Sequence, residues 1–248
     1  MSSVSAEALH PALWRGSQLG RNPRHCVATG HAALSAVLPG GGWPLGALTE
    51  LLAARPGIGE LRLLQPALAR LDSTRRIVLL RPPCVPHAAA WAAGPLPAER
   101  LLWLRPERDG DALWAAEQVL KNGSCGALLY WQPQLRAASL RRLHLAAQAH
   151  DMLFFLFRHD AAAHESSPAP LRLQLQPAGN DLRIEVVKRR GPRYESSILV
   201  PLLPRLGRRA PAAPQPSLPD PLHAPLDQRP SDAAQPRRPA PAQPLATR

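Results

Sequence analysis

Runs of consecutive apolar residues punctuate the first part of the chain. A short continuous apolar run is typical of a strand that is buried on both faces, as in a parallel sheet. Positions with helical apolar spacing separate these runs, so strands and helices alternate. The runs are Ala47–Leu52 (ALTELL), Ile77–Leu80 (IVLL), Ala127–Trp131 (ALLYW) and Met152–Phe157 (MLFFLF). The alternation predicts an α/β fold with a mostly parallel sheet that is covered by helices on both faces.

The predicted helices have recognisable boundaries. Leucines spaced along Leu61–Leu71 indicate one helix, and Pro66 should kink it or end its first turn. Asp111 can cap a second helix, for which Asn122-Gly123 is a stop signal. The same apolar spacing recurs in Leu135–Ala147, which predicts a third helix.

The later part of the chain has a different pattern. Leu171–Gln176 (LRLQLQ) and Leu182–Val187 (LRIEVV) alternate apolar and polar positions, and Arg193–Val200 is a candidate third strand. Alternation is typical of antiparallel strands with one face in water. We therefore expect an antiparallel edge on the C-terminal side of the sheet.

The clearest boundary lies at Pro204. The 45 residues from there to Arg248 contain 12 prolines, 7 arginines and 3 aspartates, and none is aromatic. Such a composition buries too little apolar surface to offset the entropy of ordering the chain. We interpret 204–248 as a disordered Pro/Arg-rich tail, either a solubilising extension or a docking arm. The preceding residues divide into an N-terminal extension, 1–29, and a folded domain, 30–203.

Composition excludes several classes of protein. The apolar runs are much shorter than the ~18 residues of a membrane span, and the N-terminal residues lack the features of a signal peptide. Three scattered cysteines form neither a disulfide framework nor a zinc-ligand set, and the histidines lack metal-binding spacing. The net charge is +12, and of the 30 basic residues only Lys121 and Lys188 are lysines. We expect a cytoplasmic α/β protein with a basic surface, no metal and no contact with membranes.

A glycine-bearing turn between a predicted strand and a predicted helix carries the candidate chemistry. The turn contains Gly57 and Gly59, and this geometry resembles a phosphate-binding loop. A working loop continues with Lys and Ser/Thr, whereas Gly59 is followed by Glu60 and Leu61. Two unit charges ~4 Å apart interact by about 4 kcal/mol at an effective dielectric near 20, so Glu60 should repel a triphosphate strongly. The loop is therefore a degenerate one, and we expect no nucleotide cofactor.

The stretch GHAALSAVLPGGGWPLGALTELL resembles the entry to the RecA ATPase core. The match continues through IVLL, DALWAAEQVLKNGSCGALLYW, MLFFLF and IEVVKRRG. Residues 9–203 as a whole resemble the ImuA family of translesion DNA synthesis-associated proteins, RecA-like relatives that are grouped with SulA-type division inhibitors. The LPGGGWPLGALTEL block is the most specific part. The resemblance implies a RecA-like, P-loop-type core.

The positions that hydrolyse ATP in RecA-type proteins have lost their chemistry here. Such an enzyme would place a carboxylate after the second strand, where this chain has Arg81–Cys84. It would end the third strand in aspartate, where this chain has Tyr130, Trp131 and then Gln132. With the loss at Glu60, three positions fail in the expected order. We therefore predict a protein that is not an enzyme and has no catalytic residues.

Basic residues near the end of the domain are the candidate interaction site. The cluster at Lys188 resembles one that lies near a subunit interface or nucleotide in recombinases. A second group of basic residues lies on one predicted helix, and we interpret it as a solvated face. It consists of Arg136, Arg141 and Arg142. The candidate interaction residues are Lys188, Arg189, Arg190, Arg193, Arg205, Arg208 and Arg209.

Three functions are compatible with the resemblance. The preferred one is a non-catalytic accessory factor of SOS-induced translesion synthesis. Its partners would be an ImuB-type Y-family polymerase homologue and an error-prone polymerase III alpha-type subunit, with RecA or DNA as further candidates. The second function is a SulA-like inhibitor that binds the tubulin-like division protein. The third is a residual ATPase or DNA-stimulated recombinase, which Glu60 and the absent carboxylates oppose.

Overall fold

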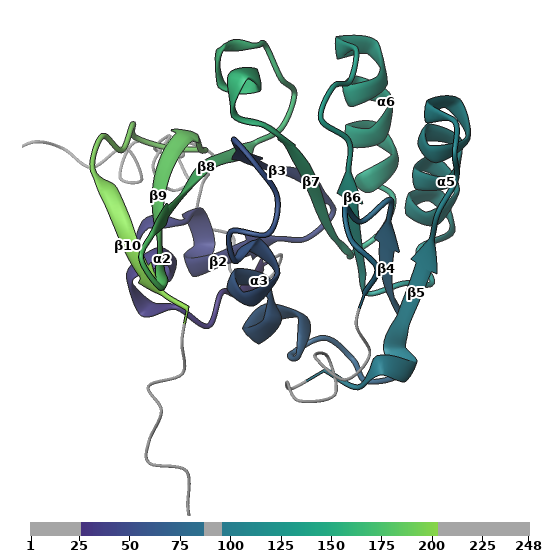
Figure 1. Cartoon of the computed structure of the whole chain (residues 1–248), viewed down its shortest axis with the longest axis horizontal. Helices are drawn as coiled ribbons and strands as arrows, with labels where there is room; N and C mark the ends of the chain where they lie inside the picture. The colour runs from purple at the N-terminus through teal and green to yellow at the C-terminus, as the bar shows by residue number, and fades with distance from the viewer. Residues whose placement is uncertain (1–25, 87–95, 203–248) are drawn as a thin grey trace, which may run out of the picture. The chain divides into compact units, whose positions relative to one another are not determined.

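The computed structural model describes residues 26–86 and 96–202. An eight-stranded sheet forms the centre of this part of the chain, in the order β10-β9-β8-β3-β7-β6-β4-β5 (Figure 1). Its strands are β3 (Ala47–Ala53), β4 (Ile77–Leu80), β5 (Leu101–Leu104), β6 (Ala127–Trp131), β7 (Leu153–His159), β8 (Leu171–Ala178), β9 (Asp181–Lys188) and β10 (Ser197–Pro201). The predicted tail, 204–248, lies outside the described residues.

The sheet confirms the predicted mixture of strand directions. The strands from β8 to β5 are parallel to their neighbours, whereas β9 and β10 pair antiparallel at the other end. The first alternating segment differs from the expectation, because β8 pairs in parallel with β3 and antiparallel with β9. One flank of β8 therefore extends the parallel sheet, while its other flank begins the antiparallel edge.

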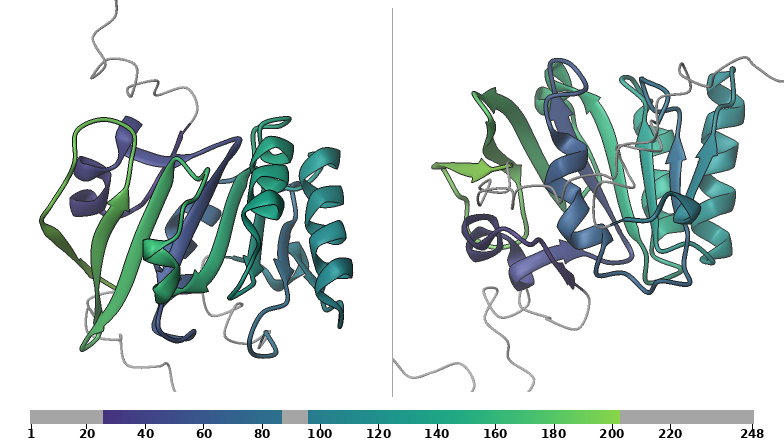
Figure 2. Two further views of the ribbon diagram at one scale, coloured as in Figure 1. Left: turned by 90° about the horizontal axis from the view of Figure 1, so that it is seen from above. Right: turned by 60° about the horizontal axis from the view of Figure 1, so that its bottom comes forward.

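Helices cover both faces of the sheet (Figures 1 and 2). Side chains of α5 (Asp109–Asn122) and α6 (Ala137–Ala147) join one buried cluster, and those of α2 (Ala32–Val37) and α3 (Glu60–Leu68) join another. The two clusters meet alternate residues of the same strands, since Leu51 belongs to one and Leu48 to the other. No helix among the described residues is long and apolar enough to cross a membrane. Single-turn helices complete the chain: η3 (Pro39–Gly41), η4 (Ala98–Arg100) and η5 (Asp160–His164).

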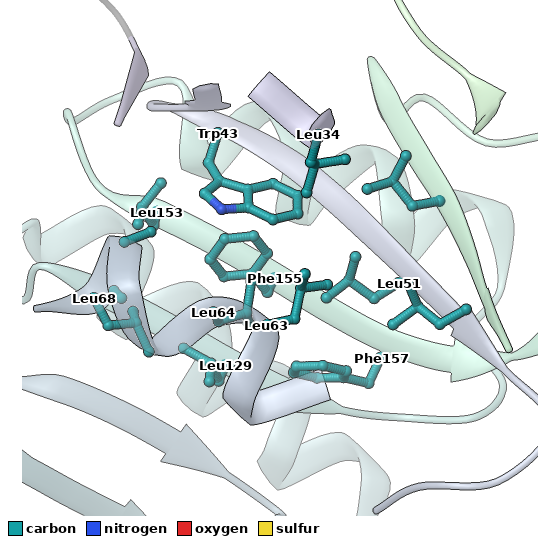
Figure 3. Packing of buried hydrophobic residues seen from close by; sticks show 14 of the residues in the cluster. Leu34, Trp43, Leu51, Leu63, Leu64, Leu68, Leu129, Leu153, Phe155 and Phe157 are labelled. Carbon is teal, nitrogen blue, oxygen red and sulfur yellow. The ribbon is translucent and has the colours of Figure 1, made fainter. Parts of the chain in front are cut away.

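A small hairpin-like sheet precedes the main one. Its strands β1 (Cys26–Ala28) and β2 (Gly42–Pro44) pair antiparallel. The described fold thus includes residues 26–29 of the predicted N-terminal extension, and Thr29 is fully buried. Trp43 on β2 is fully buried and meets Phe155 of β7 edge-on, with ring centroids 5.2 Å apart (Figure 3). This contact joins the small sheet to the centre of the main core.

Two helix boundaries differ from the prediction. The helix predicted along Leu61–Leu71 is α3, which ends at Leu68 and has Pro66 in its last turn. Proline cannot donate the hydrogen bond that continues a helix, so the helix stops soon after it instead of kinking at its start. The second helix begins at Asp109, which places Asp111 in its first turn and not at the cap. An acid there is still favourable, because it faces the positive end of the helix dipole.

Other boundaries agree with the pattern or refine it. Gly123 adopts a left-handed conformation at the end of α5, as the stop signal predicted. The strand expected within Arg193–Val200 begins at Ser197. The strand β5 was not predicted, and two of its four residues, Leu102 and Trp103, are exposed. A four-residue strand with exposed apolar side chains at the sheet end lacks the buried pattern of its neighbours.

Candidate functional site

The carboxyl ends of the parallel strands form the candidate site. Ligands of open α/β sheets bind outside these ends, where loops lead from strands into helices. The loop of residues 54–59 connects β3 to α3 at this edge, and Arg81, Gln132 and Arg158 occupy the ends of neighbouring strands. The structure therefore brings the glycine-bearing loop together with residues that are distant in sequence.

The loop holds an anion that belongs to its own chain. Gly57 and Gly59 have φ values of 81° and 115°, the left-handed region that favours glycine. The Gly57 N–H donates to Glu60 Oε1 at 2.7 Å, and the Gly59 N–H donates to Glu60 Oε2 at 3.1 Å. The Glu60 side chain is buried against the loop. Glu60 therefore accepts hydrogen bonds from both of these backbone N–H groups of the loop.

The residue that follows β10, Leu202, packs against the other side of the loop. A Cβ placed on Gly59 would lie 2.3 Å from Leu202 Cδ1, so Leu202 approaches the loop backbone closely. Leu202 itself is buried. The glycine at this position is thus required both by its backbone conformation and by the packing of the chain beyond β10.

Apolar hollows flank the loop. Trp131 at the end of β6 stacks on Phe157 of β7, with centroids 4.3 Å apart and planes 8° from parallel. One hollow of about 250 Å³ contacts both rings, and a second of about 280 Å³ shares Trp131 and Glu60. The Trp131 indole N–H is buried and has no hydrogen-bond acceptor within the described part of the chain. The second hollow is lined mainly by apolar side chains, whereas Arg55, Arg81 and Arg158 also line the first.

Arg81 directly follows β4 and brings a positive charge to this edge. It has a left-handed φ of 53°, which is uncommon for a residue with a side chain. Its guanidinium donates to Gln132 Oε1 at 2.9 Å and forms a short ion pair with Asp109. The hydrogen bond that Arg81 donates to Asp109 lowers the pKa of Asp109, whereas burial raises the pKa of nearby Tyr130 to about 12. Asp109 is a carboxylate at this edge that the sequence analysis did not single out. It lies here because it is the first residue of α5, and the sequence alone does not show where that helix begins in space.

A cluster of buried ion pairs lies within the sheet, on β3, β7 and β8. Glu50 of β3 is fully buried and accepts a hydrogen bond from Arg172 Nε at 2.5 Å and another from Ser167 at 2.9 Å. Arg158 NH1 lies 3.5 Å from Glu50, and Arg158 NH2 donates to Glu165 at 2.7 Å. The sequence signal for this cluster was a glutamate inside an otherwise apolar strand, which the analysis did not use.

The described residues of the predicted basic cluster make separate contacts with the rest of the chain. Lys188 Nζ donates to the carbonyl of Ser167 at 2.8 Å, and Arg189 donates to the carbonyls of Pro192 and Val37. The Arg189 guanidinium also lies 5.4 Å from the centre of the Tyr194 ring. Arg189 therefore reaches α2 on one side of the sheet.

Other members of that cluster lie elsewhere. Burial lowers the pKa of His144 on α6, and the charges of Arg190 and Lys188 lower it further. Arg193 is exposed. The remaining candidates, Arg205, Arg208 and Arg209, lie outside the described residues. None of the described members lines the loop that holds Glu60 or the hollows beside it.

Comparison with known proteins gives a partial similarity. No protein-family model matches the chain. A segment of 54 residues is 41% identical to the cell division inhibitor SulA of Edwardsiella piscicida. The match covers 22% of this chain and 32% of that protein, so the chain spans about a third of the relative's length. The finding supports a relationship to SulA-type proteins over one segment, and the narrower relationship to the ImuA family stays a prediction.

Removing the Glu60 carboxylate tests the self-filled loop. We expect Glu60→Ala to lower the free energy of unfolding by about 1–3 kcal/mol, because it leaves two loop N–H groups without their acceptor. Urea denaturation measures the change, with Glu107→Ala at an exposed glutamate as the matched control. Equal, near-zero effects of the two substitutions would show that Glu60 does not hold the loop.

Proposed function

We propose that the chain is a non-catalytic accessory factor of SOS-induced translesion DNA synthesis, with a RecA-like core of degenerate P-loop type. The observation that carries the proposal is the Glu60 carboxylate, which accepts hydrogen bonds from Gly57 and Gly59 in the cradle where a phosphate would lie. A triphosphate would have to displace a buried, hydrogen-bonded anion and then face its charge. This argument supports a fold that is used for binding rather than hydrolysis.

The proposed role is to bridge or regulate a polymerase complex in the cytoplasm. The partners are an ImuB-type Y-family polymerase homologue and an error-prone polymerase III alpha-type subunit, with RecA or DNA as further candidates. The family resemblance supports this choice of partners. The apolar hollows around Trp131 support a binding surface at the carboxyl edge, since apolar concave surfaces are where partner side chains anchor.

Nucleotide binding separates this proposal from a residual ATPase. We expect the full-length protein to bind no ATP–Mg²⁺ at physiological concentrations and to release no phosphate, with or without single-stranded DNA. Isothermal titration and a phosphate-release assay measure this, with an active RecA protein as the positive control. Tight ATP binding that is lost in Gly59→Pro would overturn the non-catalytic assignment.

The accessory role is tested by partner capture and by mutagenesis in cells. The tagged full-length chain should retain the ImuB-type partner or the polymerase subunit, and deletion of its gene should reduce damage-induced mutations without changing cell length. Complementation with the intact gene is the control. Failure to retain either partner, together with unchanged mutagenesis, would contradict the proposal.

A second candidate is supported by the 54-residue similarity to a cell division inhibitor. In this role the chain would bind the tubulin-like division protein and block its assembly. Overproduction should then produce filamentous cells, and the purified chain should inhibit polymerisation of the division protein. Filamentation with normal damage-induced mutagenesis in the deletion strain would favour this function over the first.

A further inference from the structure

A wide polar hollow lies at the same edge of the sheet, beyond the loop that holds Glu60. Its volume is about 920 Å³, and it opens at the ends of β4, β6 and β7. Three guanidinium groups and two carboxylates line it. They belong to Arg81, Arg136, Arg158, Asp109 and Glu165. Cations are in excess in this lining, which favours an anionic ligand.

Two helices begin at this hollow. The lining includes Asp109 and Gly110 from the first turn of α5, and Arg136 and Ser139 from the start of α6. The two helices lie side by side (Figure 1). Neither helix has a side-chain cap at its N-terminus, and α6 has no acid in its first turn. The positive dipole end of α6 therefore adds to the attraction for an anion, whereas Asp109 and Asp111 offset that of α5.

An incompletely satisfied buried cation gives independent support. The Arg158 side chain is 99% buried, since its relative exposure is 1%. Its NH2 group donates to Glu165, but its Nε and NH1 groups have no hydrogen-bond acceptor among the described residues. The 3.5 Å separation of NH1 from Glu50 is an ion pair without a hydrogen bond. These two unpaired nitrogens are themselves buried, so the Arg158 nitrogen that can exchange one carboxylate for another is Nη2, which now binds the half-exposed Glu165.

The carboxylates in the lining indicate which anion fits. Asp109 binds Arg81 although its side chain is 73% exposed, and Glu165 binds Arg158 although its side chain is 56% exposed. Both acids can therefore turn into water when another acceptor takes their place. Because each already presents a carboxylate to a guanidinium, a carboxylate from another protein would reproduce the same geometry.

We propose that this hollow binds an acidic peptide segment of a partner protein. Incoming carboxylates replace Asp109 on Arg81 and Glu165 on Arg158, and they also contact Arg136 at the start of α6. No described residue of the lining is aromatic, so the stacking that holds single-stranded nucleic acid is missing among them. The inference rests on the proposed function for the identity of the partner, but not for the chemistry of the site.

The test uses the full-length protein and a fluorescent glutamate-rich peptide. Arg136→Glu should weaken peptide binding about tenfold or more, because it places a carboxylate at the mouth of the hollow. Arg141→Glu is the matched control: it makes the same charge change at an exposed position further along α6, and should weaken binding by less than about twofold. Asp109→Asn should strengthen binding, since it removes a competing carboxylate while leaving Arg81 in place.

The outcomes distinguish this inference from its alternatives. Equal weakening by Arg136→Glu and Arg141→Glu would mean that net charge alone attracts the peptide, and would overturn the inference. Binding of a single-stranded oligonucleotide in place of the peptide, with the same dependence on Arg136, would also overturn it. If the peptide binds as expected while the polymerase partners are not retained, the site stands and the proposed function fails.

Discussion

Replacing Glu50 with leucine is expected to lower the free energy of unfolding by about 3–5 kcal/mol, because removing one partner of a buried ion pair strands the other charge. Two guanidinium groups depend on this carboxylate. Arg172 donates to it at 2.5 Å, and Arg158 pairs with it at 3.5 Å. Both arginines are buried, so neither can recover its hydration when Glu50 is lost.

Two further variants show whether charge is the cause. Glu50→Gln keeps an acceptor for Ser167 and the size of the side chain, yet we expect it to lose a large part of the same stability because the negative charge is absent. A triple variant with leucine at Glu50 and methionine at Arg158 and Arg172 should recover most of the loss, since no unpaired charge remains. Thermal and urea unfolding measure each change. A Glu50→Leu protein as stable as the parent would contradict this account of the cluster.

The second large effect is expected at Gly30, which lies between β1 and α2. Its φ is 83°, and a Cβ there would lie 2.2 Å from the Cβ of Pro66 in α3. The left-handed conformation costs about 1–2 kcal/mol for a residue with a side chain, and a steric clash adds about 1–3 kcal/mol. Gly30→Ala should therefore lower stability by about 2–5 kcal/mol.

Gly57 provides a matched control for Gly30. Its φ of 81° is nearly the same, but nothing lies within 4 Å of a Cβ placed on it. Gly57→Ala should therefore show the conformational cost alone, and the difference between the two variants measures the contact with Pro66. Comparison of their urea midpoints decides the matter. Equal losses for the two variants would mean that α3 can move away from Gly30 at no cost.

The sequence predicted the elements whose burial leaves a regular pattern, either continuous as in β7 or alternating as in β10. Strands such as β6 and β7 are buried along nearly their whole length, so their continuous apolar runs identify them. The strand β5 escaped prediction because it lies at the end of the sheet and pairs only with β4. Helix starts were less certain, because neither Arg108 nor Arg136 provides the side-chain cap that marks a helix start.

The candidate site could be predicted only in its local part. The absence of lysine after Gly59 is visible in the sequence, but the bonds from Gly57 and Gly59 to Glu60 are not. Contacts between residues that are far apart in the sequence could not be predicted. Arg81 meets Asp109 and Gln132 because β4 and β6 end, and α5 begins, at the same edge of the sheet, and no periodicity in the sequence encodes that contact.

Glu60 also affects how the loop responds to the state of the cell. An anion supplied by the same polypeptide is present at fixed stoichiometry, so its occupancy does not follow the ratio of ATP to ADP. The Gly57 and Gly59 N–H groups therefore acquire their acceptor when the chain folds, without a ligand from solution.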